Sequence, residues 1–148
     1  MELIHAMNDL AAAIGMRPVE PEESGGFTLL FDGEHEVAFV PDGSATFFHA
    51  VVGEAADLDR EALLSLLEAS LLGADTDGAA FGIHKALGEV VLWKRYGEFS
   101  GKADLETAIH AFLGQVLEWK RRLAEGRFAL PTADTPFPSA FGGRFLQV

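Results

Sequence analysis

The leucine-rich stretch LDREALLSLLEASLLG, at residues 58–73, is central to the organisation of the chain. Asp59 can cap the start of a helix and Gly73 can close it in a left-handed conformation, so the stretch predicts a helix of about four turns. Its leucines spread over a wider arc of the helix than one sheet can cover. Two interpretations are open. The helix is either fully buried in a monomer, or it packs on its own sheet with one side and on a second subunit with the other.

The composition is that of one globular domain. The chain has 148 residues, of which 49% are hydrophobic and 23% charged, and this length is near the usual size of a single domain. Its formal net charge of −12 argues against nucleic acid and membrane as partners, because both would repel it. It has no cysteine, and its first fifteen residues lack a signal-peptide pattern, so we expect a cytoplasmic protein.

The N-terminal half predicts one helix and three strands. Apolar residues recur at helical spacing up to Gly15, which indicates an amphipathic first helix. After a polar loop come three apolar runs, FTLLF, EVAFV and ATFFHAVV, separated by Asp32-Gly33 and by the sequence PDGS. Such turns between apolar runs predict an antiparallel meander. The third run is apolar on both faces, so we expect it at the centre of the sheet or covered on its second face.

The C-terminal half predicts a hairpin and a long helix. Residues 79–87 and 89–96 read as two strands, and residues 104–125 as a helix that Asp104 caps and Gly126 ends. The order α-β-β-β-α-β-β-α indicates an α+β fold, with an antiparallel sheet of about five strands and three helices. We expect residues 1–126 to form this domain. Residues 127–148 form a tail rich in Pro, Gly and Phe that has no helical or strand period.

The sequence has no pattern that predicts catalysis or metal binding. The five histidines are spread over different elements, with no pair at metal-ligand spacing. The run DTDG at 75–78 resembles the start of a calcium loop, but Ala86 stands where a bidentate Glu is needed. There is no G-x-S-x-G motif. We therefore expect no enzyme, and we expect the basic residues at 94–95 and 120–122 to balance local acids.

Four quoted stretches, together with size, acidity and element order, resemble a known family. They are LDREALLSLLEASLLG, AAFGIHKA, VVLWKRY and ADLETAIHAFLGQVLEWKRRLAE. The pattern is similar to that of the class I type III secretion chaperones, typified by the chaperone of the translocated intimin receptor, over roughly residues 1–125. The resemblance implies a bacterial cytoplasmic homodimer that uses no nucleotide, metal or other cofactor. Such a chaperone holds the N-terminal segment of a secreted effector, often a virulence protein, in non-globular form and keeps it export-competent.

The resemblance also implies two sets of binding residues, and for each residue a place in the ordinary core is the alternative. The implied dimer interface lies on the middle helix and the strand after it: Leu63, Leu66, Leu67, Leu71, Phe81 and Ile83. The implied effector-binding residues lie on the first helix and the sheet: Leu3, Met7, Leu10, Leu29, Phe39, Phe47 and Trp93.

Two other functions stay open on the sequence alone. Twelve phenylalanines could line the pocket of a small α+β cup that binds an apolar molecule, or of a hydrolase-like enzyme. A regulator with a chaperone fold could instead bind folded proteins without a link to secretion. The tail adds a hypothesis of its own, because Phe137, Phe141 and Phe145 resemble apolar anchors at intervals. The tail could occupy the effector groove until a partner arrives, or be a flexible or surface-packed end.

Overall fold

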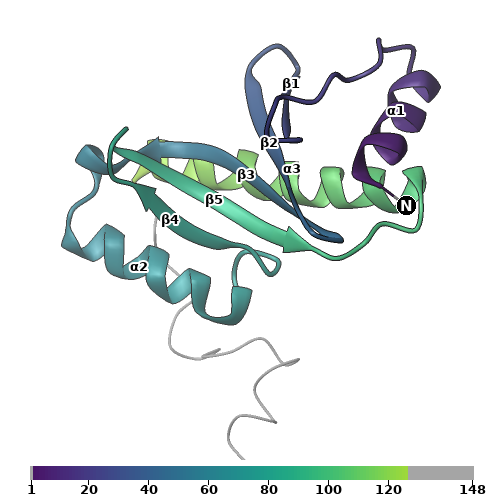
Figure 1. The fold of residues 1–148 in the computed structure, drawn as a ribbon. Coiled ribbons are helices and arrows are strands. Elements are labelled where there is room, and N and C mark those ends of the chain that lie inside the picture. Colours follow the sequence, from purple (N-terminus) through teal and green to yellow (C-terminus); the bar gives the residue numbers. More distant parts are fainter. Residues whose placement is uncertain (1, 127–148) are drawn as a thin grey trace, which may run out of the picture.

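The computed structural model describes residues 2–126, and its order of elements confirms the predicted α+β fold (Figure 1). The helices are α1 (Leu3–Ala13), α2 (Arg60–Ser70) and α3 (Lys102–Glu125), with short 3-10 turns η1 (Ala55–Asp57) and η2 (Leu71–Gly73). The strands are β1 (Phe27–Phe31), β2 (His35–Asp42), β3 (Ala45–Glu54), β4 (Ala80–His84) and β5 (Glu89–Tyr96). No helix in this range is both long and apolar enough to cross a membrane.

The five strands form one antiparallel sheet in the order β1-β2-β3-β5-β4. The expectation that the third strand is central is confirmed, since β3 lies between β2 and β5. His49 pairs with Ala38 on one side and Trp93 on the other. Because side chains alternate along a strand, Phe48 points to one face of the sheet while Phe47 and His49 point to the other.

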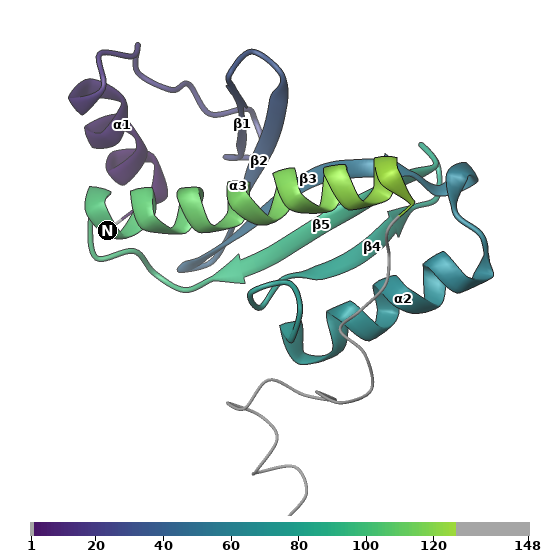
Figure 2. The same ribbon diagram turned by 180° about the vertical axis from the view of Figure 1, so that it is seen from behind.

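The long helix α3 covers one face of the sheet and creates the core (Figure 2). Phe48 lies at its centre, with its ring centroid 4.6 Å from that of Phe39 and 5.8 Å from that of Phe112. Trp119 packs edge-on against Phe81 at 4.7 Å. α1 packs on the N-terminal half of α3, far from the end at which α3 reaches Gly126 (Figure 2). The opposite face of the sheet faces the viewer in Figure 1 and carries none of the helices formed by residues 2–126.

Several turn and cap predictions are confirmed at the backbone. Asp32 and Gly33 both have positive φ, 52° and 69°, as a tight hairpin turn requires. The Asp59 carboxylate accepts a hydrogen bond from the Ala62 amide at 2.8 Å and caps α2. Gly126 ends α3 with a φ of 67°.

Three predicted boundaries differ from the structure. α2 ends at Ser70 because Leu71 has an extended ψ of 108° and Leu72 has a φ of 54°, which no right-handed α-helix allows, so residues 71–73 form a separate turn. α3 begins at Lys102 with Gly101 as its N-cap. Asp104 is therefore inside the first turn, where its carboxylate accepts from the Ser100 amide at 3.0 Å. β4 ends at His84, since residues 85–88 form the turn to β5.

Candidate partner-binding surfaces

Helix α2 lies along the outer edge of β4 (Figure 1), and several of its leucines are exposed. The Ser70 hydroxyl accepts from the Phe81 amide at 3.0 Å and donates to the Leu66 carbonyl at 2.8 Å, so one side chain joins helix and strand. Leu66 is buried against the sheet at 3% exposure. The outward leucines, 38–67% exposed, are here called the α2 leucine face: Leu63, Leu64, Leu67, Leu71 and Leu72.

The loop after α2 is closely packed and determines the position of the helix. A Cβ on Gly73 would lie 2.2 Å from the Cα of Gly78, so the two backbones touch there. Thr76 is fully buried, and its hydroxyl donates to the Ala79 carbonyl. Lys94 lies 3.7 Å from the Asp77 carboxylate and holds the loop from the side of β5. The α2 leucine face is therefore presented by a fixed element.

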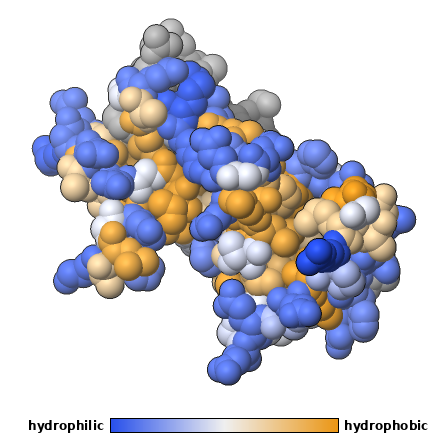
Figure 3. All heavy atoms as spheres, turned by 90° about the horizontal axis from the view of Figure 1, so that it is seen from above, coloured by the Kyte–Doolittle hydropathy of each residue, from blue (hydrophilic) through white to orange (hydrophobic). Residues whose placement is uncertain are grey.

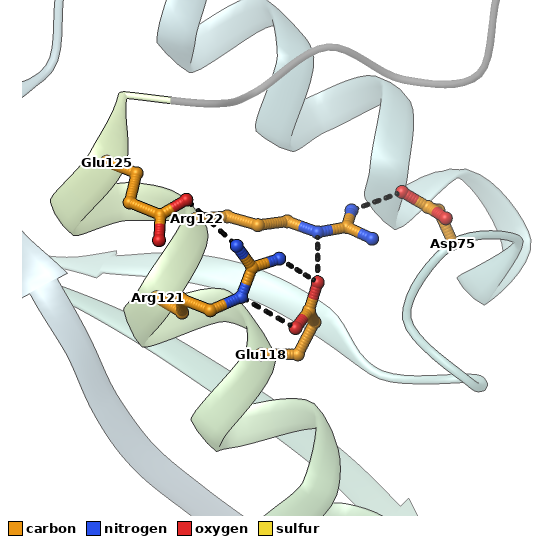
Figure 4. A network of polar contacts seen from close by, with 5 residues as sticks. All are labelled: Asp75, Glu118, Arg121, Arg122 and Glu125. Carbon is orange, nitrogen blue, oxygen red and sulfur yellow. Dashed lines mark hydrogen bonds and ion pairs between the residues drawn. The ribbon is translucent and has the colours of Figure 1, made fainter.

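A network of ion pairs joins the end of α3 to the same loop (Figure 4). Glu118 accepts from Arg121 at 2.7 Å and from Arg122 at 2.9 Å, while Arg121 also reaches Glu125 at 2.8 Å. Arg122 continues to Asp75 at 3.0 Å. Hydrogen bonds from the two arginines lower the pKa of Glu118 from its ordinary 4.5 to about 2. These cations balance local acids as expected.

The other predicted basic residues have mixed partners. Arg95 pairs with Asp42 at 3.0 Å, which agrees with the expectation that it balances a local acid. Lys120 instead lies 3.1 Å from Nδ1 of His35, an imidazole and not a carboxylate. Within residues 2–126, no group of three or more acidic or histidine side chains is placed to hold a metal ion.

An apolar groove of about 330 Å³ lies between α1, β1 and α3 and is here called the α1 groove. Met7, Leu10 and Ile109 form its buried floor. Its rim carries three exposed side chains, Ile14 at 61%, Met16 at 47% and Leu30 at 56%. Apolar side chains also reach the surface at the α1 end of the molecule in the view of Figure 3.

Charge at the α1 groove is confined to its rim. Asp32, Glu106 and His110 are exposed side chains that line the groove. Beside it, β1 is the last strand of the sheet, and one of its edges has no strand partner within residues 2–126. The α1 groove therefore lies next to a strand edge that has no partner within residues 2–126.

The uncovered face of the sheet is a second apolar surface, here called the open sheet face. Phe47 and Trp93 lie side by side with ring centroids 5.8 Å apart, and Trp93 is 39% exposed. Val51 is exposed to 40%. His49 is half-buried between the strands, and burial lowers its pKa, which favours the uncharged imidazole. An antiparallel sheet with one solvated face usually carries polar residues there, so this face is unusually apolar.

The structure separates the residues implied for a dimer interface. Leu63, Leu67 and Leu71 belong to the α2 leucine face, and Ile83 on β4 is 48% exposed. Leu66 instead packs inside the subunit, and Phe81 is partly buried against Trp119. Leu66 and Phe81 therefore hold α2 and β4 in position by packing inside the subunit.

The residues implied for effector binding fall in four places. Met7 and Leu10 form the floor of the α1 groove, and the half-buried Leu29 lines it. Phe47 and Trp93 meet on the open sheet face. Leu3 is half-buried beside a separate hollow of about 500 Å³ near residues 43–46 and Glu98.

Phe39 alone among the seven is wholly internal. It is 0% exposed, because its ring stacks on that of Phe27 at 5.0 Å and packs edge-on against that of Phe48 at 4.6 Å. It therefore has no surface to offer a partner.

Sequence reasoning missed the rim of the α1 groove, namely Ile14, Met16 and Leu30. One signal was present, since the successive apolar residues Leu29 and Leu30 must point to opposite faces of a strand. One of the two therefore had to face outward.

A family model now gives this geometry a context. The model for the Tir chaperone protein (CesT) family matches residues 5–120. This chain belongs to the CesT family. The resemblance inferred from sequence is thereby confirmed, and the chain is a member of a family of chaperones. A comparison with curated proteins finds no match.

Solved structures show that the CesT fold is shared at low sequence identity. A chain of the ExsC-ExsE complex is 22% identical, with a TM-score of 0.70, covering 83% of this chain and 97% of that one. A chain of the heterodimeric ExoU-SpcU complex from Pseudomonas aeruginosa is 18% identical, with a TM-score of 0.62 and coverages of 80% and 95%. The Yersinia pestis chaperone SycH, in complex with a fragment of YscM2, is 13% identical, with a TM-score of 0.61 and coverages of 78% and 98%.

Proposed function

We propose that this CesT-family chain is a type III secretion chaperone that binds the N-terminal segment of a secreted effector and keeps it non-globular and export-competent. The observation that carries the proposal is the α1 groove, an apolar hollow beside an edge of β1 that has no strand partner in the described part of the chain, residues 2–126. The neighbouring ExsC-ExsE and SycH-YscM2 structures are complexes of two different proteins, which supports a partner-binding role.

The proposed mechanism is strand addition combined with side-chain docking. An extended segment can pair its main chain with the free edge of β1, while its apolar side chains enter the groove. Because the segment becomes ordered only on binding, it loses conformational entropy, and a long contact must compensate for this loss. The open sheet face, with Phe47 and Trp93, supplies additional apolar surface for a longer segment. No chemical step is required, so we propose a chaperone that is not an enzyme.

We also propose a cytoplasmic homodimer in which two α2 leucine faces meet. The five leucines of this face are 38–67% exposed in one subunit, and contiguous apolar patches on soluble proteins usually mark interaction sites. A second copy is the simplest partner, since a two-fold interface matches each face with itself. The net charge of −12 supports a protein that does not bind nucleic acid or membrane.

A pull-down from the cytoplasm of the source bacterium tests the function. The full chain is compared with an Ile14→Ser/Leu30→Ser variant of the groove rim and with a control, Leu87→Ser. Leu87 is 66% exposed in the turn before β5, outside all three surfaces. We expect the wild type and the control to capture one dominant partner, protected from proteolysis near its N-terminus. The groove variant should capture much less of it.

Two results would contradict the proposal. One is capture of a partner through a folded domain, which would favour a chaperone-fold regulator. The other is that native mass spectrometry finds a small apolar molecule and no protein. That outcome would favour the cup hypothesis, since about 330 Å³ is at the low end for ligand pockets.

A further inference from the structure

We propose that residues 137–145 of this chain occupy its own α1 groove when no effector is bound. The proposal rests on the proposed function in one respect, because it takes the groove to be the effector's site. It concerns an interaction within the chain, between a segment beyond residue 126 and a groove formed by α1, β1 and α3.

The α1 groove favours an apolar occupant. Ile14, Met16 and Leu30 expose about half or more of their side chains at its rim, above a floor that is already apolar. Within residues 2–126 no element covers this rim. An uncovered apolar surface with a concave shape favours binding of apolar side chains over contact with water.

The geometry of α3 sets the distance that the segment has to span. Leu113 lines the groove, and the helix continues thirteen residues to Gly126, a length of about 20 Å at 1.5 Å per residue. Residues 127–136 can span up to about 33 Å when extended. These ten residues are therefore long enough to return along α3 and bring Phe137 to the groove.

The composition of the segment suits an extended ligand. Phe137, Phe141 and Phe145 provide apolar anchors. Two prolines and a glycine pair between or beside them disfavour a helix: Pro136, Pro138, Gly142 and Gly143. An extended backbone can also pair with the free edge of β1, as in other cases of strand addition. Both binding contributions proposed for an effector are thus available within the chain.

Charge favours the same contact. Of the chain's 11 Lys and Arg and 23 Asp and Glu, residues 127–148 hold only Arg127, Arg144 and Asp134. The segment is therefore formally +1, whereas the rest of the chain is −13. The groove rim carries the carboxylates of Asp32 and Glu106, which Arg144 can approach when Phe145 or Phe141 docks.

The α2 leucine face is nearer to Gly126 but is a poorer match. Arg122 and Asp75 join the end of α3 to the loop after α2, so the segment starts close to that face. A convex row of leucines on a helix is suited to a second helix. A segment interrupted by Pro and Gly cannot form one.

Disulfide trapping tests the contact, and the absence of cysteine from the chain makes the experiment specific. One variant combines Leu30→Cys at the groove rim with Ser139→Cys in the segment. The matched control combines Leu87→Cys with Ser139→Cys. Leu87 and Leu30 are both well exposed, at 66% and 56%.

The control position lies near the end of α3. The Gly88 carbonyl accepts from the Ala55 amide at 2.7 Å, and Leu123 packs close to Gly53. A segment that does not dock would therefore meet Leu87→Cys at least as often as Leu30→Cys. The readout is the rate of intramolecular disulfide formation under mild oxidation, followed by non-reducing mass spectrometry at low protein concentration.

We expect the Leu30→Cys pair to close roughly tenfold faster than the control pair, because docking raises the local thiol concentration above that given by a linker alone. Adding Phe137→Ser, Phe141→Ser and Phe145→Ser should remove the difference. In the chain without added cysteines, the same triple substitution should increase amide exchange in residues 27–31. Equal rates, a faster control pair, or a disulfide that joins two chains would overturn the proposal.

The result does not depend on the effector. If the disulfide forms preferentially in the groove but the pull-down captures no partner, the intramolecular contact is supported and the secretion function is contradicted. If the pull-down captures an effector but the disulfide does not form preferentially in the groove, the secretion function is supported and the intramolecular contact is contradicted.

Discussion

Gly73 and Gly78 touch each other in the loop that joins α2 to β4. Gly73 has a φ of 67°, and a Cβ there would lie 2.2 Å from the Cα of Gly78. The position therefore excludes a side chain for two reasons, backbone conformation and space. Because this loop follows α2 directly, a close contact between two glycines lies next to the α2 leucine face.

We predict that Gly73→Ala destabilises the fold more than Gly88→Ala. Gly88 has a φ of 66°, but a methyl group at this position would meet no atom within 4 Å. Its substitution should therefore cost only the left-handed conformation, roughly 1–2 kcal/mol. Gly73→Ala adds a backbone clash to that cost. Urea unfolding of both variants measures the difference. Equal unfolding midpoints would contradict the prediction, because they would show that the loop accommodates the added methyl group at no extra cost.

Glu118 is the residue whose charge the structure stabilises most clearly. Hydrogen bonds from Arg121 and Arg122 lower its pKa from 4.5 to about 2 in the folded state. A lowered folded-state pKa contributes stability above the unfolded-state value, and this contribution is lost as pH falls from about 4.5 towards 2.

We therefore predict that Glu118→Gln is less stable than the wild type at pH 7 and that the two converge between pH 4.5 and 2. Because these side chains are partly exposed, the difference should shrink in 1 M salt. Thermal unfolding across the pH range measures both effects. A constant difference from pH 7 to pH 2 would mean that the carboxylate is not held by the arginines.

Local sequence patterns were sufficient to predict helices and strands where periodicity and turn signals agree. The bounds of β1 and β5 match their predicted runs, because FTLLF ends at an Asp-Gly turn and the last strand begins after Gly88. The end of α2 was not predictable in this way. A Leu with positive φ is rare, and the turn at Leu72 is followed by a close approach of Gly73 to Gly78 that no local pattern reveals.

Local sequence patterns also could not predict which apolar residues lie in the core and which lie on the surface. Leu66 and Leu67 are neighbours on one helix, yet they are 3% and 67% exposed. The difference depends on where α2 lies relative to β4, which is a tertiary relation. Phe39 and Phe47 differ likewise, since only the cover provided by α3 decides which face of the sheet is internal.

The proposed α2 contact gives a testable prediction. Leu67→Asp should convert the dimer, of mass twice 15.9 kDa, into a folded monomer. An unpaired carboxylate in the interface should cost at least about 2 kcal/mol, and two-fold symmetry introduces it twice. Leu87→Asp, at nearly the same exposure, should remain a dimer. Light scattering and circular dichroism provide the measurement, and a dimeric Leu67→Asp protein would contradict the interface.

The three apolar surfaces are distributed around one sheet. The α2 leucine face lies beyond the β4 edge, while the α1 groove lies at the β1 end. A dimer formed through α2 would therefore place its two grooves at opposite ends. Both would remain accessible, and the open sheet faces would lie between them as additional apolar surface.

The two edges of the sheet differ, and the difference bears on self-assembly. Exposed strand edges are common starting points for runaway strand pairing between copies. The Phe81 amide on β4 is occupied by the Ser70 hydroxyl, while β1 has one edge without a strand partner among residues 2–126 but is only five residues long. So short an edge can form only a few main-chain hydrogen bonds with a strand from another chain. Pairing at β1 therefore becomes stable only when the side chains of that strand also fit the α1 groove. If the chain holds an effector segment as proposed, the shortness of the β1 edge should also limit strand pairing between copies of the chain itself.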